Sequence, residues 1–288
     1  YNVIHVHSGT PLRIFYLFAA KRAGVRTRIY HSHSAKVTGP HKLLHVKRAV
    51  FEMLKQFFPW CATDYFACSE LAGQWMFPRR IQDKVRIIHN GIDTEKFRYN
   101  PEVEREYRKK LNLENNFVIG HIGRFNDQKN HTFLLDIFKE VAERNEDARL
   151  LLIGEGELEE QIKEKIHRLN LEQKVLLLGV RRDVAQLFQV MNVFVLPSNY
   201  EGLPVVGIEA QASGNLCLLS DQVTPETVIT PNVKLLSIKS TDIWVREIEK
   251  AKSFQKTDTS ELIRKHGYDI KDSVRRMEKF YKSRGKVE

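Results

Sequence analysis

Short apolar runs alternate with longer amphipathic stretches along most of the chain. In the first third, this pattern predicts strands at Val3–Val6, Thr27–Tyr30, Tyr65–Cys68 and Val85–Ile88, and helices at Leu12–Ala23, Lys42–Phe58 and Glu70–Met76. Short apolar strands that alternate with helices are typical of a parallel α/β sheet. The first third is therefore predicted to form such a sheet.

The same alternation returns after a polar interruption. The turn signal Asn90-Gly-Ile-Asp93 and the charge-rich segment Thr94–Leu113 indicate a boundary between two domains. Beyond it, strands are predicted at Phe117–Ile122, Arg149–Ile153, Val175–Leu178, Val193–Leu196 and Leu216–Ser220, separated by helices at His131–Arg144, Leu158–Leu169, Val184–Val190 and Val205–Ser213. After Pro231 the pattern weakens, with helices near Ile243–Ser253, Thr259–His266 and Ile270–Lys282. This run of βα units predicts a doubly wound parallel sheet.

Composition places the chain among soluble globular proteins, because 42% of its residues are hydrophobic and 28% are charged. No apolar run approaches the roughly 20 residues that span a bilayer, and the sequence opens as a strand rather than as a secretory signal. Cys61, Cys68 and Cys217 form no Cys-x-x-Cys pair, which favours reduced thiols over a disulfide or a zinc site. We therefore expect a cytoplasmic protein.

The excess positive charge lies entirely in the first third. Residues 1–100 hold 16 Lys and Arg against 6 Asp and Glu, whereas the remaining residues hold 30 of each. This asymmetry indicates that the first third faces an anionic partner, which is a membrane, an acidic acceptor or nucleic acid. The basic amphipathic stretch from His41 to Phe58 fits docking on anionic lipid, although an ordinary helix packed on a core has the same pattern. The asymmetry favours peripheral membrane association, and the lack of an interleaved aromatic platform argues against nucleic acid.

Ligands of open α/β sheets bind in the loops after the strands, so these loops contain the candidate sites. The loop after Phe117–Ile122 carries Arg124 and Lys129, which suit a diphosphate but could equally be two solvated charges. The loop after Arg149–Ile153 reads Gly154-Glu-Gly-Glu157. It lacks the third glycine of a dinucleotide-binding motif and its carboxylates would repel a pyrophosphate, so we interpret it as a tight turn before a helix.

The most informative loop is Pro197-Ser-Asn-Tyr-Glu201-Gly-Leu-Pro-Val-Val-Gly-Ile-Glu209. Gly202 allows close approach of the backbone to a ligand. Pro204 is preset for the first turn of a helix, whose free N–H groups favour anions. Glu201 precedes this helix, and Glu209 lies about one and a half turns inside it. The two carboxylates could bind two different sugars of one ligand, or Glu201 could cap the helix while Glu209 is solvated.

Histidines are concentrated near the start, with 7 of 11 in residues 1–100. His5 and His7 alternate on one predicted strand, and His31 and His33 follow the next. Such pairs raise the question of a metal. No Cys, Asp or Glu precedes Glu52, however, so we expect no metal site. Four of the seven are interpreted as hydrogen-bonded core or loop residues: His5, His41, His45 and His89.

In their order and spacing, these elements resemble the retaining glycosyltransferases of family 4, which have a GT-B fold of two facing Rossmann-like domains. Bacterial capsule and exopolysaccharide enzymes are the most similar. The resemblance covers the whole chain through His5-Val-His7, Asn90-Gly-Ile-Asp93, Gly123-Arg124…Lys129, Ile153-Gly-Glu-Gly156, Phe194-Val-Leu-Pro-Ser198 and Glu201-x7-Glu209.

The resemblance implies an acceptor-side domain at 1–93, a donor-binding domain at 94–266 and a helix at 267–288 that crosses back toward the first domain. The family's acceptor-side domain normally opens with a glycine-rich loop after its first strand, and we find none before Val3. We therefore expect the first domain to be incomplete.

The resemblance also assigns roles to single residues. Arg124 and Lys129 would hold the donor diphosphate, and Glu201 would contact the transferred sugar. The backbone of Gly202, Leu203 and Pro204 would bind the sugar hydroxyls and phosphate. Glu209 would bind the ribose, and Val180 would lie at the base, with Arg181 as a further candidate there. His31, with His33 as the second choice, would hydrogen-bond the donor sugar or shape the acceptor site. Asn192 replaces a common Asp of the family, and we interpret that position as structural.

These assignments predict transfer of a sugar from a nucleotide diphosphate sugar, UDP-linked, to a lipid-linked glycan at the inner membrane face, with retained configuration. The fold family generally needs no metal, so we expect neither a metal nor a tightly bound cofactor. Two alternatives stay open: a nucleotide-sugar epimerase of related fold, and a donor-binding module without turnover.

Overall fold

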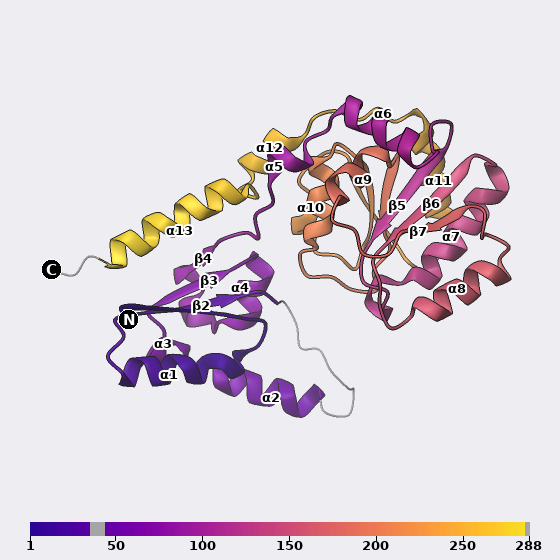
Figure 1. Ribbon diagram of the computed structural model, residues 1–288. Coiled ribbons are helices and arrows are strands. Elements are labelled where there is room, and N and C mark those ends of the chain that lie inside the picture. The colour runs from indigo at the N-terminus through magenta and orange to yellow at the C-terminus, as the bar shows by residue number, and fades with distance from the viewer. Residues whose placement is uncertain (35–43, 286–288) are drawn as a thin grey trace. The chain divides into compact units, whose positions relative to one another are not determined.

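A computed structural model describes residues 1–34 and 44–285. The chain forms two compact units (Figure 1): unit 1 comprises Tyr1–Gly91 and Asp269–Glu288, and unit 2 comprises Ile92–Tyr268. Both units are α/β with an all-parallel sheet, as the sequence predicted. The predicted helix start at Lys42, together with His41, lies outside the described residues. None of the described helices is long and apolar enough to cross a membrane.

Unit 1 is built on four parallel strands in the order β1-β2-β3-β4. The strands are β1 (Val3–Ser8), β2 (Thr27–Ser32), β3 (Asp64–Ala67) and β4 (Val85–Ile87). The helices are η1 (Pro11–Arg13), α1 (Ile14–Arg22), α2 (Leu44–Lys55), α3 (Phe58–Cys61), α4 (Glu70–Met76), η3 (Arg79–Lys84) and α13 (Ile270–Gly285). Both β1 and β2 continue two residues beyond their predicted ends, so His7 and His31 lie on strands.

The alternation of side chains gives the sheet of unit 1 two different faces. Tyr30 packs with Leu17 of α1 and with Phe58 of α3 on one face. On the other face, Phe66 packs against Phe280 of α13, with ring centroids 5.0 Å apart. The C-terminal helix therefore covers a face of the sheet formed by the first part of the chain.

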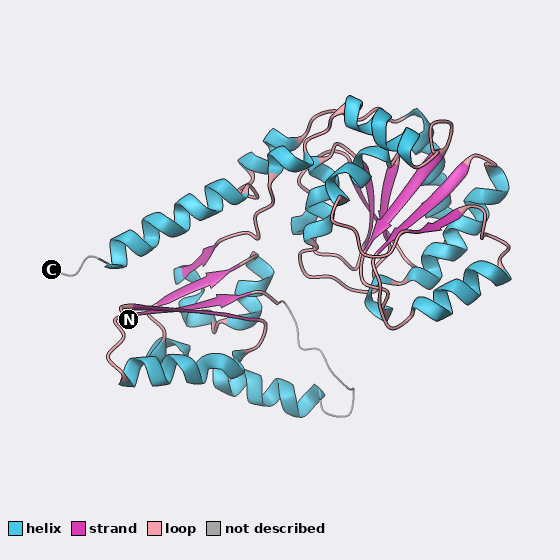
Figure 2. Cartoon of the chain, in the orientation of Figure 1, coloured by secondary structure: helices cyan, strands magenta, loops and turns pink. Residues whose placement is uncertain are grey.

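Unit 2 contains six parallel strands in the order β10-β9-β8-β5-β6-β7 (Figure 2). The strands are β5 (Phe117–Ile122), β6 (Ala148–Ile153), β7 (Val175–Leu177), β8 (Val193–Leu196), β9 (Leu216–Ser220) and β10 (Val233–Leu236). The helices are α5 (Thr94–Phe97), α6 (Pro101–Lys110), η4 (Asp127–Lys129), α7 (His131–Arg144), α8 (Glu159–Arg168), α9 (Val184–Val190), α10 (Val205–Ala212), η5 (Pro225–Thr227), α11 (Asp242–Lys250), η6 (Ala251–Ser253) and α12 (Ser260–Lys265). The chain reverses direction across the sheet between β5 and β8, which makes their ends the expected ligand position.

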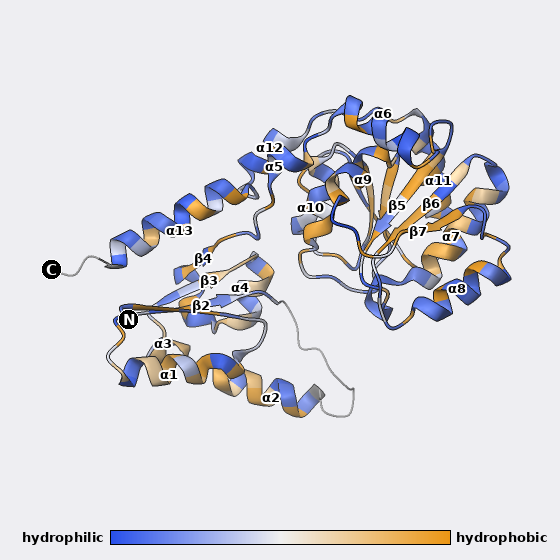
Figure 3. Ribbon diagram, viewed as in Figure 1, coloured by the Kyte–Doolittle hydropathy of each residue, from blue (hydrophilic) through white to orange (hydrophobic). Residues whose placement is uncertain are grey.

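Helices cover both faces of this sheet, so its strands are apolar along most of their length (Figure 3). Ile119, Leu150 and Val193 pack against α7, α8 and α11 on one face. Val118 and Phe194 pack against α9 and α10 on the other. This two-sided burial explains why β5 to β9 were predicted to within one residue at each end.

Five elements of unit 2 were not predicted: α5, α6, β10 and the short 3-10 helices η4 and η5. No residue of helix α6 is fully buried, and its apolar signal is limited to Val103 and Tyr107 among mostly charged residues. Its signal lies in its cap, because the Asn100 side chain accepts from the N–H groups of Glu102 and Val103. The segment interpreted as a polar boundary is thus helical and belongs to unit 2.

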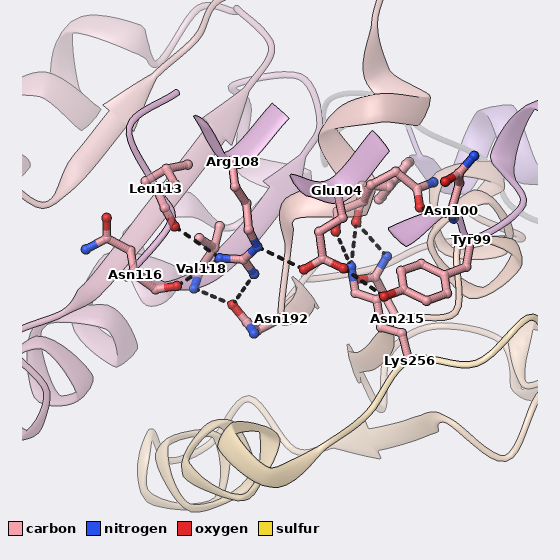
Figure 4. A network of polar contacts seen from close by, with 12 residues as sticks. Tyr99, Asn100, Glu104, Arg108, Leu113, Asn116, Val118, Asn192, Asn215 and Lys256 are labelled. Carbon is pink, nitrogen blue, oxygen red and sulfur yellow. Dashed lines mark hydrogen bonds and ion pairs between the residues drawn. The ribbon is translucent and has the colours of Figure 1, made fainter. Parts of the chain in front are cut away.

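A polar network ties α6 to the start of the sheet (Figure 4). Asn192 Oδ1 accepts from Arg108 Nη2 at 2.9 Å and from Val118 N at 2.8 Å, and Arg108 Nε donates to Glu104 at 2.8 Å. The structural interpretation of Asn192 is therefore supported, since its side chain fastens α6 to the first residues of β5.

Candidate functional site

The loops after β5 and β8 meet at the point where the sheet reverses direction. Lys129 ends η4 in the first loop, and its Nζ lies 2.6 Å from Oε1 of Glu201 in the second. The two side chains are only 15% and 9% exposed. The structure thus brings together two predicted site residues that are far apart in the sequence.

Glu201 is held by two further donors that the sequence did not reveal. Gln128 Nε2 donates to Oε2 at 2.9 Å, and Ser198 Oγ donates to Oε1 at 3.2 Å. The loops are also joined through their backbones, because Asn199 N donates to the carbonyl of Gln128 at 2.8 Å. No side chain caps α10, so the alternative role of Glu201 as a helix cap is wrong.

Helix α10 begins at the residue that the sequence predicted. Pro204 is its N-cap with extended backbone, and Val205 is its first residue. Gly202 and Leu203 are half-buried in the loop before it. The N-terminal end of α10 thus follows directly on the loop that carries Glu201.

Glu209 is half-buried on α10 rather than solvated. Within the described residues, no hydrogen bond or ion pair holds its carboxylate. Burial raises the pKa of Glu209, and Lys96 opposes this rise. A half-buried carboxylate without a protein partner is suited to accept hydrogen bonds from ligand hydroxyls.

Arg124 and Val180 line a common cavity of about 760 Å³, together with Glu159 and the turn Gly154-Glu-Gly-Glu157. The guanidinium of Arg124 is 71% exposed and pairs with Glu157 at 3.1 Å. Val180 is 67% exposed in the loop after β7. Arg181 forms a two-bond pair with Asp183, at 2.8 and 2.6 Å, and lowers the pKa of that carboxyl to about 2.

The glycines of the turn after β6 are packed against the loop after β5. A Cβ on Gly154, which has φ +136°, would lie 2.1 Å from the carbonyl oxygen of Gly123. A Cβ on Gly156 would lie 2.4 Å from the carbonyl oxygen of Phe125. The interpretation as a tight turn is supported, and its glycines shape the loop that carries Arg124 and Lys129.

A buried histidine pair lies beneath the same loop and was not predicted. His121 of β5 and His131 of α7 are 0% and 1% exposed, with ring centroids 4.6 Å apart. The His131 ring also contacts Phe125 at 4.7 Å. Burial, followed by the charge of Lys129, lowers the pKa of His131 to about 4. The pair is therefore uncharged at neutral pH and packs under the loop.

In unit 1, the two histidines of β1, His31 of β2 and His33 just after β2 form one cluster. Their rings lie close together in pairs: His5 stacks on His7 with centroids 4.0 Å apart, and the His31 ring is tilted against that of His33 at 4.3 Å. Burial, with smaller contributions from the neighbouring histidines, lowers the pKa of His5 to about 3 and that of His31 to about 2. The candidates His31 and His33 therefore belong to a larger array of histidine rings.

The other histidines of the first third have simpler surroundings. His89 Nδ1 lies 3.0 Å from the carbonyl oxygen of Cys68, as expected for a hydrogen-bonded loop residue. His45 is exposed on α2, so its interpretation as a hydrogen-bonded core or loop residue is wrong.

Both units match known protein families. Residues 103–269 match the family described as glycosyl transferases group 1, and residues 1–96 match glycosyltransferase family 4. EpsF of Bacillus subtilis (strain 168) is 32% identical over 286 residues, which cover 95% of this chain and 73% of EpsF.

Two further relatives match shorter stretches. The UDP-Gal:alpha-D-GlcNAc-diphosphoundecaprenol alpha-1,3-galactosyltransferase of Escherichia coli is 31% identical over 77% of this chain and 58% of its own length. The capsular polysaccharide biosynthesis glycosyltransferase CapM of Staphylococcus aureus is 34% identical over 58% of this chain and 45% of its own.

Among solved structures, Alr3699/HepE of Anabaena in complex with UDP is similar with a TM-score of 0.78. The match has 19% identity and covers 97% of this chain and 78% of that one. It supports the predicted two-domain GT-B architecture. The chain has two parallel sheets, matches the two glycosyltransferase families, and has relatives in capsule biosynthesis. It therefore belongs to the family 4 glycosyltransferases of GT-B fold.

Proposed function

We propose that this protein is a retaining glycosyltransferase that moves a sugar from a UDP-sugar to a lipid-linked glycan in surface polysaccharide synthesis. The observation that carries the proposal is the meeting of Lys129 and Glu201 at the reversal point of the sheet, 2.6 Å apart. A cation for the diphosphate and a carboxylate for the sugar are thereby held side by side, where an open α/β sheet binds its ligands.

The reaction breaks the bond between the anomeric carbon of the sugar and the diphosphate. It forms a bond from that carbon to the oxygen of an acceptor hydroxyl on the same face, and the hydroxyl proton leaves with the diphosphate. Negative charge develops on the leaving diphosphate. The ammonium of Lys129 has three N–H donors, of which Glu201 takes one. The others, with the exposed guanidinium of Arg124, would stabilise that charge.

The remaining candidates fit the other parts of the donor. Glu209 would bind the ribose hydroxyls, Val180 would contact the base, and the backbone of Gly202–Pro204 would bind sugar hydroxyls and phosphate. His31, with His33 as the second choice, would hydrogen-bond the sugar or shape the acceptor site.

A UDP-linked donor is supported by the name of the Escherichia coli relative and by the UDP in the Anabaena structure.

The acceptor side is supported by two observations. The Escherichia coli relative is named for a diphosphoundecaprenol acceptor, which is a lipid carrier. Helix α2 of unit 1 exposes Val46, Val50 and Met53 beside the exposed Arg48. An apolar stripe beside basic residues fits an anionic lipid surface, so we assign peripheral membrane contact to α2.

The donor site is tested by a thermal-shift screen of nucleotide sugars against the wild type, Glu209→Ala and Glu146→Ala. UDP should raise the melting temperature of the wild type, because a ligand that binds only the folded state stabilises it. Glu209→Ala should lose this shift. Glu146 is exposed on the same unit and serves as the control, whose shift should equal that of the wild type. An equal shift in all three proteins would refute the ribose assignment.

Turnover is tested with a labelled UDP-sugar, with and without a lipid-linked acceptor. A transferase labels the acceptor. A nucleotide-sugar epimerase changes the donor without acceptor, and a module without turnover changes neither. Either of the last two results would contradict the proposal.

A further inference from the structure

A row of imidazoles lines one face of the unit 1 sheet. His5 and His7 project from β1, and His31 projects from β2, where it is the register partner of His7. One ligand atom from each of the three lies within 4.8 Å of the others. The three side chains come from two neighbouring strands of one sheet, so the fold fixes their relative positions.

Two of these histidines have buried ring nitrogens without a protein partner. His31 is 5% exposed, and neither of its ring nitrogens meets hydrogen-bond geometry with a partner in the described chain, although the backbone of Ile88 lies nearby. His5 Nε2 is likewise buried and unpartnered. Orphaned polar atoms in a buried position cost free energy unless a ligand or water binds them. These nitrogens therefore indicate a missing partner.

The Nδ1 atoms of His5 and His7 are held in place. His5 Nδ1 lies 2.6 Å from the hydroxyl of Tyr281 on α13, and His7 Nδ1 lies 2.9 Å from Nε2 of His33. A metal-binding histidine is typically oriented in this way, with one nitrogen on the ion and the other in a hydrogen bond. Tyr281 and His33 occupy that supporting position here.

We propose that His5, His7 and His31 bind one divalent transition-metal ion of the zinc class in unit 1. A set of three imidazoles suits zinc, copper or nickel. Zinc bonds of about 2.0–2.1 Å bring ligand nitrogens to within about 3.4 Å of one another, so the rings must close by a little over 1 Å. The exposed His7 can make most of that movement. A fourth position would stay open to water.

The lack of Cys, Asp and Glu before Glu52 spoke against a metal in the sequence, but a site of three imidazoles needs neither carboxylates nor thiolates. His31 belongs to both proposals, but the test replaces His7 and Tyr281 and measures binding of the metal rather than turnover. Loss of turnover and loss of metal binding are therefore separate results.

The test titrates Co²⁺ into chelator-treated protein without a histidine tag, and follows the visible absorption of the protein-bound ion. We expect saturation at one equivalent and displacement by Zn²⁺. His7→Gln should abolish the saturable signal, and His7 is chosen because its exposure makes its replacement the least disruptive to folding in this set. His45→Gln, at an exposed histidine of the same unit, should bind as the wild type does.

A second variant addresses the supporting hydrogen bond. Tyr281→Phe keeps the ring but removes the hydroxyl from His5, and should weaken Co²⁺ affinity by about 10- to 100-fold. Thermal unfolding of the metal-free variants verifies that both are folded. The proposal is overturned if the wild type shows no saturable binding, or if folded His7→Gln binds as tightly as the wild type.

Discussion

At the scale of single residues, Lys256 shows how the surroundings of a side chain change its pKa. Its Nζ donates to the carbonyl oxygens of Phe188 and Gln189, near the C-terminal end of α9 (Figure 4). It also lines a polar cavity of about 300 Å³ with Tyr99 and Glu104. Burial lowers the pKa of Lys256 from 10.5 to about 7, with Glu104 opposing. The sequence shows only one lysine among many.

The depressed pKa of Lys256 predicts a pH-dependent stability. The unfolded chain holds the proton up to about pH 10.5, whereas the folded chain releases it near pH 7. The free energy of unfolding should therefore rise with pH between these values, by the linkage of proton binding to folding. Lys256→Met should remove this rise.

The measurement is urea unfolding of unit 2 at several pH values, followed through the fluorescence of Trp244 with Trp60 and Trp75 replaced by Phe. The difference between wild type and Lys256→Met cancels the titration of other groups. A difference that stays constant from pH 7 to pH 10 would show that Lys256 does not titrate in this range.

At the scale of elements, the sequence predicted the sheet of unit 2 closely and its loop contacts hardly at all. Strands β5, β8 and β9 coincide with their predictions, because burial on both faces leaves an unbroken apolar run. The pairing of Lys129 with Glu201 and the position of Gln128 depend on strand order, which periodicity does not encode. The candidate residues could be named from the resemblance, but not their contacts.

The contact of Gly156 with the loop after β5 predicts the effect of a single methyl group. In Gly156→Ala the new Cβ meets the backbone of Phe125, which cannot yield as a flexible side chain would. We expect a loss of about 1–3 kcal/mol of stability and weaker UDP binding, since Arg124 and Lys129 would shift. Calorimetry with UDP and thermal unfolding measure both.

Gly24→Asn is the control, because Gly24 has φ +76° and no atom lies within 4 Å of the position that a Cβ would take there. Asn tolerates this backbone region. UDP affinity as in the wild type for Gly156→Ala would contradict a role of this turn in shaping the loop.

At the scale of the whole molecule, the excess positive charge of the first third belongs mostly to unit 1. The prediction of a basic first third concerned composition alone, and the structure adds where apolar side chains are exposed on it. Val46 and Met53 on α2 are 62% and 56% exposed, whereas Phe51 and Leu54 of the same helix are buried. One helix thus has an inner face for the core and an outer apolar stripe.

This arrangement predicts binding to anionic vesicles. The chain should cosediment with phosphatidylglycerol vesicles, and far less with phosphatidylcholine. Lys47→Glu/Arg48→Glu should weaken binding by at least about 1 kcal/mol per residue, and Val46→Ser/Met53→Ser should weaken it at any salt concentration. Lys109→Glu/Lys110→Glu on α6 of unit 2 is the charge-matched control. Equal losses in the α2 and α6 charge variants would argue against α2 as the contact.

The packing of Phe280 against Phe66 has a consequence for synthesis on the ribosome. Unit 2 is one continuous segment, Ile92–Tyr268, and can fold as soon as it has emerged. Unit 1 begins earlier but needs α13, which is translated after all of unit 2. The apolar face that includes Ile29 and Phe66 therefore stays uncovered while all of unit 2 is translated. Unit 1 starts to be made before unit 2 and is completed after it, and during that interval its open face is the part most exposed to aggregation and to chaperones.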